Sequence, residues 1–228
     1  MATQSDIETT RERMLLAAGP VFAEKGYHGA TVRDLCKAAG VNVASVNYHF
    51  GDKLRLYIET VKLAQRSRAK NASYPVWSVE TPPEEKLRGF IGTLMARMLA
   101  PSDQPWQSRL MMREILQPTE ACRELVAEQF RPQFEALLAI LRELAPAGTP
   151  LRALRQMGFS VVGQCLHYRF AGEVVSLLTP PREYQKYYGV DALADQITQF
   201  SLRAVRTWSA ADENGQACDA APSSETLA

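Results

Sequence analysis

Apolar residues recur every three to four positions along most of the chain, and strict alternation of apolar and polar residues is nearly absent. This spacing matches the turn of an α-helix and not the pleat of a strand. The sequence SDIE at residues 5–8 reads as a capping box, with Ser5 as the cap and Glu8 reaching back. The helix that starts at this cap contains Pro20, which must remove one backbone hydrogen bond, so we expect a kink there and not an end. We expect Gly26 to close this first helix. The pattern predicts an all-α protein.

Two short helical patterns fill TVRDLCKAAGVNVASVNYHF, residues 31–50. Thr31 caps the first pattern, with Asp34 where a capping box usually has Glu or Gln. Gly40 ends it, and Asn42 caps the second. A fourth helix begins near Asp52 and runs towards residue 70. The predicted inner residues are Ile7, Met14, Leu15, Ala18 and Phe22 in the first helix, then Val32, Leu35, Cys36, Ala39, Val46, Phe50, Leu54, Tyr57, Ile58, Val61 and Leu63.

The polar, proline-bearing stretch NASYPVWSVETPP at residues 71–83 is the clearest break in the chain. Helical patterns follow at roughly 84–100, 104–117, 119–146, 151–178 and 190–209. Pro132 should kink or split the third of these patterns. The tail has little to bury and is predicted to be disordered. We therefore expect a domain at 1–53, a second domain at 54–210 that opens with a connecting helix at 54–70, and a tail at 211–228.

Composition fits a water-soluble globular protein, with 46% hydrophobic and 22% charged residues among 228. The net charge is +1, so any attraction to a polyanion must be local. Residues 1–53 balance six basic against six acidic residues, whereas residues 54–70 carry five basic residues and one acidic residue. That flanking stretch should attract DNA without regard to base sequence. Its basic residues are Arg55, Lys62, Arg66, Arg68 and Lys70.

Neither a signal peptide nor a run of about 18 apolar residues is present, which predicts a cytoplasmic protein that does not enter a membrane. Four widely spaced cysteines without a C-x-x-C pair fit reduced thiols. The histidines His28, His49 and His167 lie on unrelated segments, and no spacing typical of a zinc site occurs. The sequence has no G-x-S-x-G, P-loop or G-x-G-x-x-G motif. We predict no enzymatic activity, no catalytic or metal-binding residues and no cofactor.

Two short helices joined by a tight glycine-containing turn form a helix-turn-helix unit, whose second helix enters the major groove of DNA. Val46 and Phe50 anchor that helix, while its outer face, Val43, Ala44, Ser45 and Asn47, is small or polar, as a groove requires. Asn47 suits an adenine edge, Ser45 suits several bases, and small apolar side chains suit a thymine methyl group. Periodicity alone is equally compatible with a helical hairpin that belongs to a bundle and does not bind DNA. The predicted DNA-binding residues are Asn42, Val43, Ala44, Ser45 and Asn47, with Tyr48, His49, Lys53 and the amides at Thr31 for phosphate.

The stretch GYHGATVRDLCKAAGVNVASVNYHFGDKLRLY, residues 26–57, closely resembles the DNA-binding domain of the TetR/AcrR family of transcriptional regulators. SVNYHFGDK, MMREILQPTEAC and GQCLHYRFAGEVV further resemble the CecR branch of that family. Two departures stand out: Asn47 replaces a frequent aromatic residue, and Gly19-Pro20 interrupts a helix that the family usually keeps regular. The resemblance implies a homodimer with an N-terminal three-helix head and a C-terminal helical domain for ligand binding and dimerisation. It implies a repressor that a small-molecule effector releases from operator DNA by changing the spacing of the two heads.

The resemblance also directs the search for an effector site and a dimer surface. Methionine and aromatic side chains suit an aromatic or drug-like effector, although each also fits an ordinary core. The candidates are Trp106, Met111, Met112, Gln164, His167, Tyr168 and Phe170. Arg113 and Arg169 either meet an acidic ligand or pair with Glu114 and Glu173. Two apolar stripes predict a dimer surface, with intramolecular core as the alternative: Leu154, Met157, Val161, Cys165 and Tyr168, and Val190, Leu193, Ile197, Phe200, Ala204 and Trp208. A helical ligand-binding or interaction protein without operator binding remains the alternative function.

Overall fold

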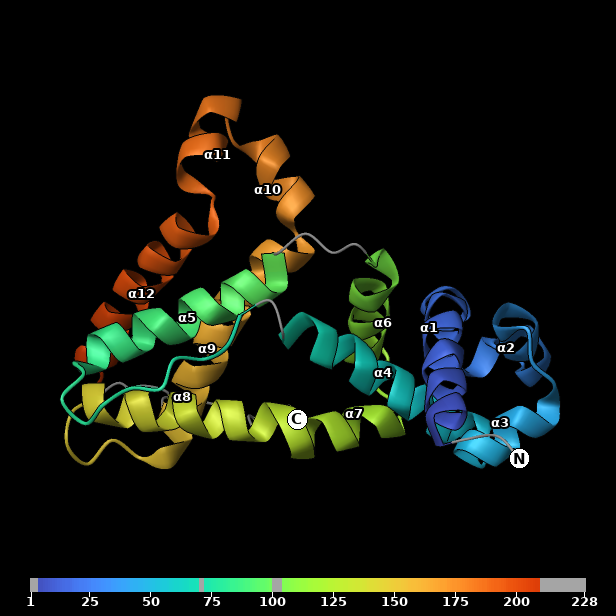
Figure 1. Cartoon of the computed structure of the whole chain (residues 1–228). Helices are drawn as coiled ribbons and strands as arrows, with labels where there is room; N and C mark the ends of the chain where they lie inside the picture. Colours follow the sequence, from blue (N-terminus) through green and yellow to red (C-terminus); the bar gives the residue numbers. More distant parts are fainter. Residues whose placement is uncertain (1–3, 70–71, 100–103, 210–228) are drawn as a thin grey trace, which may run out of the picture. The chain divides into compact units, whose positions relative to one another are not determined.

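The computed structural model describes residues 4–69, 72–99 and 104–209, without the side chains of 4–8 and 68–69. Every regular element in these ranges is helical (Figure 1), so the all-α prediction is confirmed. None of these helices combines the length and apolar composition that a membrane crossing needs. The elements are α1 (Gln4–Gly29), α2 (Val32–Ala39), α3 (Val43–Phe50), α4 (Lys53–Ala69), α5 (Pro83–Leu99), α6 (Pro105–Leu116), α7 (Glu120–Leu125), the π-helical η1 (Val126–Phe130), α8 (Arg131–Leu144), α9 (Leu151–Phe170), α10 (Gly172–Leu178), α11 (Pro181–Tyr187) and α12 (Val190–Arg206).

The chain divides into two compact units. Unit 1 comprises residues 1–75 and 93–135, and unit 2 comprises residues 76–92 and 136–228. Unit 1 therefore contains α1 to α4, α6, α7 and η1, and unit 2 contains α9 to α12. The division falls inside α5 and inside α8, so each of these helices contributes to both units.

Helix α1 does not end at Pro20, as predicted, but its backbone leaves helical geometry at Gly26, where φ is 70° and ψ is 176°, and the helix is assigned as far as Gly29. The side chains of the predicted Ser5–Glu8 capping box lie outside the described residues. Gly19 has a packing role, because a Cβ atom there would lie 2.5 Å from the indole ring of Trp106. The glycine that departs from the family pattern thus allows α6 to approach α1.

A single hydrophobic core runs through unit 1, and α1, α2, α3, α4, α6 and α7 all contribute to it. At its centre Phe22 and Tyr57 are fully buried, with ring centroids 4.9 Å apart in an edge-to-face arrangement. Leu110 from α6 and Leu125 from α7 belong to the same cluster. The three N-terminal helices are therefore packed together with α4, α6 and α7 around one interior.

Several predictions for the later helices need correction. The pattern at 119–146 is α7, η1 and α8, so the split comes from a π-helical turn just before Pro132. That turn shifts the hydrogen-bond register next to a residue that has no N–H to donate. The pattern at 151–178 is two helices interrupted at Ala171. Helix α11 was not predicted; it begins at Pro181, because a proline is tolerated in the first turn of a helix. The predicted disordered tail lies outside the described residues.

Unit 2 is built around the packing of α9 against α12. Much of the two stripes that predicted a dimer surface fills this intramolecular core: Leu154, Val161, Cys165, Leu193 and Ile197 are all buried. For these residues the dimer prediction is wrong, because their side chains already have partners within the protomer. Phe200 remains 59% exposed on α12, and Phe159 remains 64% exposed on α9. Helices α10 and α11 connect α9 to α12 (Figure 1) and bury none of their residues.

Candidate nucleic-acid interface

The turn between α2 and α3 is fixed by side-chain caps at both helix starts. The Thr31 backbone N–H donates to Asp34 Oδ2 at 3.1 Å, and the Asp34 N–H donates to Thr31 Oγ1 at 3.1 Å, which completes the predicted capping box. Gly40 ends α2 with φ 64° and ψ 37°, the left-handed geometry that favours glycine. Asn42 Oδ1 accepts the Ser45 N–H at 2.9 Å. These three predictions are confirmed, and together they hold α3 at a defined angle to α2.

Helix α3 presents a small and polar face to its surroundings. Its anchors Val46 and Phe50 are 1% and 7% exposed, as predicted. Val43 is 47% exposed and Tyr48 is 72% exposed, while Ala44 and Asn47 are also exposed and Ser45 is half-buried. An exposed helical face without bulky charged side chains is the shape that a major groove accepts.

The Asp34 carboxylate strengthens the start of α2. The Thr31 N–H, the Lys25 ammonium at 3.0 Å and the Thr31 hydroxyl lower the pKa of Asp34 from 3.8 to about 2. A negative charge at a helix N-terminus is favourable because the amides there carry partial positive charge. The Thr31 and Asp34 amides are occupied by the capping box. A phosphate at this end would therefore have to meet the remaining amides of the first turn, those of Val32 and Arg33.

Lys53, predicted to bind phosphate, uses its ammonium inside the protein. Its Nζ donates to the carbonyl oxygens of Tyr27 at 2.9 Å and Ala30 at 3.1 Å, and lies 4.5 Å from the centre of the Tyr27 ring. Lys53 thus fixes the start of α4 to the end of α1, and a phosphate contact would use its third N–H donor. Tyr48 and His49 lie side by side on α3, with ring centroids 5.0 Å apart.

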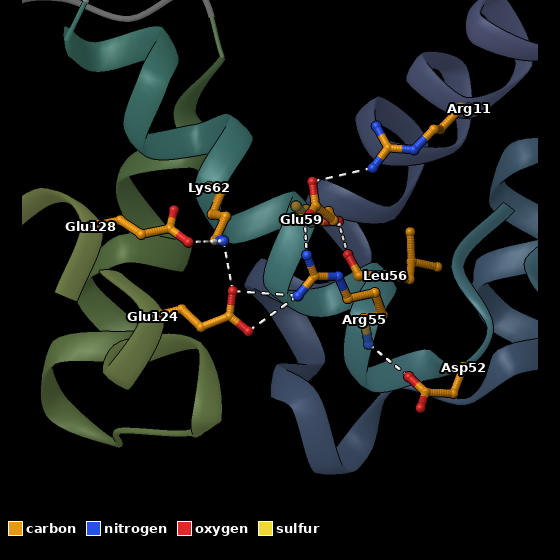
Figure 2. A network of polar contacts seen from close by, with 9 residues as sticks. Arg11, Asp52, Arg55, Leu56, Glu59, Lys62, Glu124 and Glu128 are labelled. Atoms are coloured by element: carbon orange, nitrogen blue, oxygen red, sulfur yellow. Dashed lines mark hydrogen bonds and ion pairs between the residues drawn. The ribbon is translucent and has the colours of Figure 1, made fainter. Parts of the chain in front are cut away.

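Lys62 does not offer its charge to DNA, which corrects the prediction for the basic stretch that follows the head. The residue is 5% exposed, and its Nζ lies 2.6 Å from both Glu124 and Glu128 (Figure 2). Burial alone would lower the pKa of Lys62, but hydrogen bonds to these two carboxylates outweigh it, so the pKa is raised above 10.5. Lys62 therefore ties α4 to α7 and η1.

Arg55 belongs to the same network and is likewise paired. It contacts Glu59 at 3.0 Å and Glu124 at 3.1 Å, and Glu59 also binds Arg11 of α1 at 3.1 Å (Figure 2). Of the basic residues that were predicted to attract DNA, Arg66 is exposed. The side chains of Arg68 and Lys70 lie outside the described residues. The network neutralises much of the charge that the sequence places next to the head.

Glu114, one of the two partners considered for Arg113, is buried and is bound by other groups. It is 1% exposed, and its Oε2 accepts the Tyr57 hydroxyl at 2.6 Å. Its Oε1 accepts the Thr119 N–H at 2.7 Å, the Thr119 hydroxyl at 2.8 Å and the Cys122 N–H at 2.9 Å. Burial, followed by the Glu114 carboxylate, raises the pKa of Tyr57, which keeps its hydroxyl a donor. Arg113, for which pairing with Glu114 was one of two alternatives, donates to the Glu24 carbonyl at 2.9 Å.

The predicted effector residues fall into two groups, one in each unit. In unit 1, Trp106 packs on Gly19, Met111 is buried in the core and Met112 is half-buried. In unit 2, Gln164 lines an open hollow of about 210 Å³ between α9 and α12, together with Met157, Phe200 and Trp208. The remaining candidates of unit 2 are His167 and Phe170, which are exposed, and Tyr168, which is half-buried.

Two family profiles match the chain. Residues 15–60 match the profile described as bacterial regulatory proteins of the tetR family. Residues 83–205 match the C-terminal domain of the HTH-type transcriptional dual regulator CecR. The second match alone spans more than half of the 228 residues.

Curated relatives match mainly the N-terminal part. The transcriptional repressor AcnR of Corynebacterium efficiens is 39% identical over 72 residues, which cover 32% of this chain and 37% of AcnR. The transcriptional regulator UidR of Escherichia coli is 33% identical over 66 residues, 29% of this chain and 33% of UidR. AcnR of Corynebacterium diphtheriae is 27% identical over 149 residues, 65% of this chain and 72% of that protein. The first two matches span about a third of each relative.

Solved structures share the fold. A TetR-like transcriptional regulator from Rhodococcus sp. RHA1 has a TM-score of 0.60 at 17% identity, covering 90% of this chain and 98% of that one. The hemolysin II regulator HlyIIR has a TM-score of 0.54 at 23% identity, covering 84% and 98%. The two family profiles show that the chain belongs to the TetR family of DNA-binding transcriptional regulators, in the branch that carries a CecR-like C-terminal domain.

Proposed function

We propose that this regulator is a homodimeric repressor that reads operator DNA with α3 and leaves it when a small molecule binds the C-terminal domain. The observation that carries the proposal is the exposed face of Val43, Ala44 and Asn47 on α3, a helix capped by Asn42 and anchored by its buried residues Val46 and Phe50. AcnR, which is similar over this region, is named a repressor. Repression is therefore the mode proposed for this chain.

Base contacts are assigned to the outer face of α3. Asn47 is suited to pair with an adenine edge, and Ser45 can meet several bases. Val43 and Ala44 offer apolar contact to a thymine methyl group. Phosphate contacts are assigned to Tyr48, His49 and the third donor of Lys53, and at the other end to the first-turn amides of α2.

The dimer surface is assigned to the exposed part of α9 and α12, where Phe159 and Phe200 lie. Large apolar side chains that stay exposed on a protomer mark surfaces for association. A two-fold dimer presents two α3 helices to half-sites that lie about 34 Å apart, one turn of DNA. An effector that binds better to another head spacing lowers operator affinity by shifting the population.

The effector class proposed is an aromatic or drug-like small molecule. In unit 2, the candidates Gln164, His167, Tyr168 and Phe170 supply aromatic surface and hydrogen-bonding groups. In unit 1, Trp106 and Met111 are committed to packing, so their contribution would require the core around α6 to rearrange. Met112 is half-buried and remains a candidate.

The test is a footprint on genomic DNA, including the region upstream of the gene itself, followed by a gel-shift titration of the protected duplex. The proposal expects saturable, sequence-selective binding that falls steeply as salt rises, because phosphate contacts release counterions. Protection of two half-sites would support the dimer. Absence of selective retardation at low salt would leave a helical ligand-binding or interaction protein without operator binding.

A further inference from the structure

We infer that Arg113 and Glu114, consecutive residues of α6, are positioning residues for operator binding. They hold α1 and α4, the two helices that flank the helix-turn-helix, and so set the direction in which α3 points. The inference rests on the proposed function, since it concerns how the same surface reaches DNA. Neither residue is assigned a contact to DNA.

Glu114 joins three helices through one buried carboxyl group. One oxygen accepts the hydroxyl of Tyr57 on α4, and the other accepts the Thr119 and Cys122 amides at the start of α7. An acidic side chain that is 1% exposed is stable only when it is paired or fully hydrogen-bonded. Displacing α4 from α6 would leave this carboxyl group without the Tyr57 donor. The arrangement therefore resists movement of α4 relative to α6 and α7.

Arg113 holds α1 at the residue where its backbone breaks. Its Nη2 donates to the Glu24 carbonyl at 2.9 Å, two residues before Gly26. A Cβ atom at Gly26 would lie 2.9 Å from Arg113 Nη1. Glycine at this position therefore allows the guanidinium to approach the backbone, and it also adopts the φ of 70°. The Arg113 Nε is buried and has no acceptor within the described residues. An unpaired buried donor costs free energy, so the position of Arg113 rests on the Nη2 hydrogen bond to Glu24 and on its close contact with Gly26.

Lys53 binds the backbone that directly follows the same break. Its Nζ binds the carbonyl oxygens of Tyr27 and Ala30, which follow Gly26. Tyr57, the partner of Glu114, comes one helical turn after Lys53 on α4. Two residues, Gly51 and Asp52, separate the end of α3 from the start of α4, and Asp52 Oδ1 accepts the Arg55 N–H at 2.7 Å. The direction of α4 is therefore transmitted to α3 through a short, hydrogen-bonded link.

The experiment compares Arg113→Met with Arg109→Met. Arg109 lies one turn earlier on α6 and is exposed, so the control removes the same charge from the same helix. The probes are the footprinted operator duplex, the same duplex with one half-site scrambled, and duplexes with the half-site spacing changed by one or two base pairs. Binding is measured by fluorescence anisotropy at low salt.

Arg113→Met is expected to weaken binding to the full operator about tenfold, the size typical of losing one charge-assisted hydrogen bond. The affinity for the single half-site should stay within about twofold of wild type, since one head reads it without regard to spacing. Arg109→Met should change both affinities equally. The inference is overturned if Arg113→Met weakens both probes equally, or if it behaves like the control.

Tyr57→Phe provides the second variant, because it removes the donor to Glu114 and keeps the ring packed on Phe22. It should reproduce the selective loss on the full operator, with helical circular dichroism unchanged. If Arg113→Met fails to fold, Tyr57→Phe alone decides, and an unselective loss overturns the inference. If wild type binds no duplex selectively, the proposed function fails first, and that failure is visible before any variant is compared.

Discussion

The indole ring of Trp106 lies directly against the backbone of Gly19, so that a Cβ atom at residue 19 would be 2.5 Å from the ring. A glycine inside a helix costs about 1 kcal/mol relative to alanine, and here the close approach of α6 explains it. We predict that Gly19→Ala lowers the free energy of unfolding by about 1–3 kcal/mol, the usual effect of overpacking. Urea unfolding followed by circular dichroism measures it.

The matched control for this prediction is Gly163→Ala in α9, where an added Cβ atom meets nothing within 4 Å. That substitution should be neutral or stabilise the protein by up to about 1 kcal/mol, because alanine favours the helix. Replacing Trp106 by leucine in the Gly19→Ala background should recover much of the lost stability. A Gly19→Ala protein as stable as wild type would show that the ring can move aside.

The charge of Asp34 should make the stability depend on pH in the acid range. Because folding depresses the pKa of Asp34 to about 2, its contribution is complete above about pH 4 and is lost as the pH falls through about 2. Asp34→Asn should therefore be less stable than wild type at pH 5, and the difference should shrink towards pH 2. Urea midpoints at stepped pH values test this. A difference that stays constant across the range would assign the effect to the hydrogen bonds that Asp34 Oδ2 accepts and not to its charge.

Asn47 and Tyr48 should differ in how their loss affects DNA binding. Asn47→Ala should relax the preference at one base pair by about 1–3 kcal/mol, because one edge contact disappears. Tyr48→Phe should weaken binding to all sequences similarly, since phosphate contacts carry no base information. Competition titrations against operator duplexes with single base-pair changes measure both. A uniform loss for Asn47→Ala would remove it from the base-reading residues.

Phe200→Glu should shift the protein from dimer to monomer and lower operator affinity. Phe200 is 59% exposed on α12, so a charge there costs the protomer little and places two like charges across a two-fold interface. Sedimentation velocity at several concentrations, with unfolding monitored in parallel, measures the effect. Gln199→Glu, one residue earlier and also exposed, is the control. An unchanged sedimentation coefficient for Phe200→Glu would show that Phe200 does not lie in the dimer interface.

Features set by neighbouring residues were predictable from the sequence. The caps at Thr31 and Asn42 and the left-handed Gly40 depend on residues within one turn, and all three are present. Helix α11 was missed because the expected helical patterns stop at residue 178 and resume at 190, although the proline at its start is well suited to a first helical turn.

Features that join distant segments were not predictable. The partners of Lys62 lie in α7 and η1, and the partner of Arg113 is a backbone carbonyl in α1. Periodicity shows that Leu193 and Ile197 face a partner but not whether that partner is the same chain. Leu193 and Ile197 are buried inside unit 2, so their partner is the same chain. The proposed dimer interface rests instead on the exposed side chain of Phe200.

The continuous core of unit 1 has a consequence for experiments that transplant such heads between regulators. A fragment ending at residue 60 would strip Leu110, Met111, Ala121 and Leu125 from the interior and uncover Phe22 and Tyr57. The excised piece should then aggregate or stay partly molten. A chimera that exchanges operator preference should therefore carry α6 and α7 with the head, or replace only the outward residues of α3.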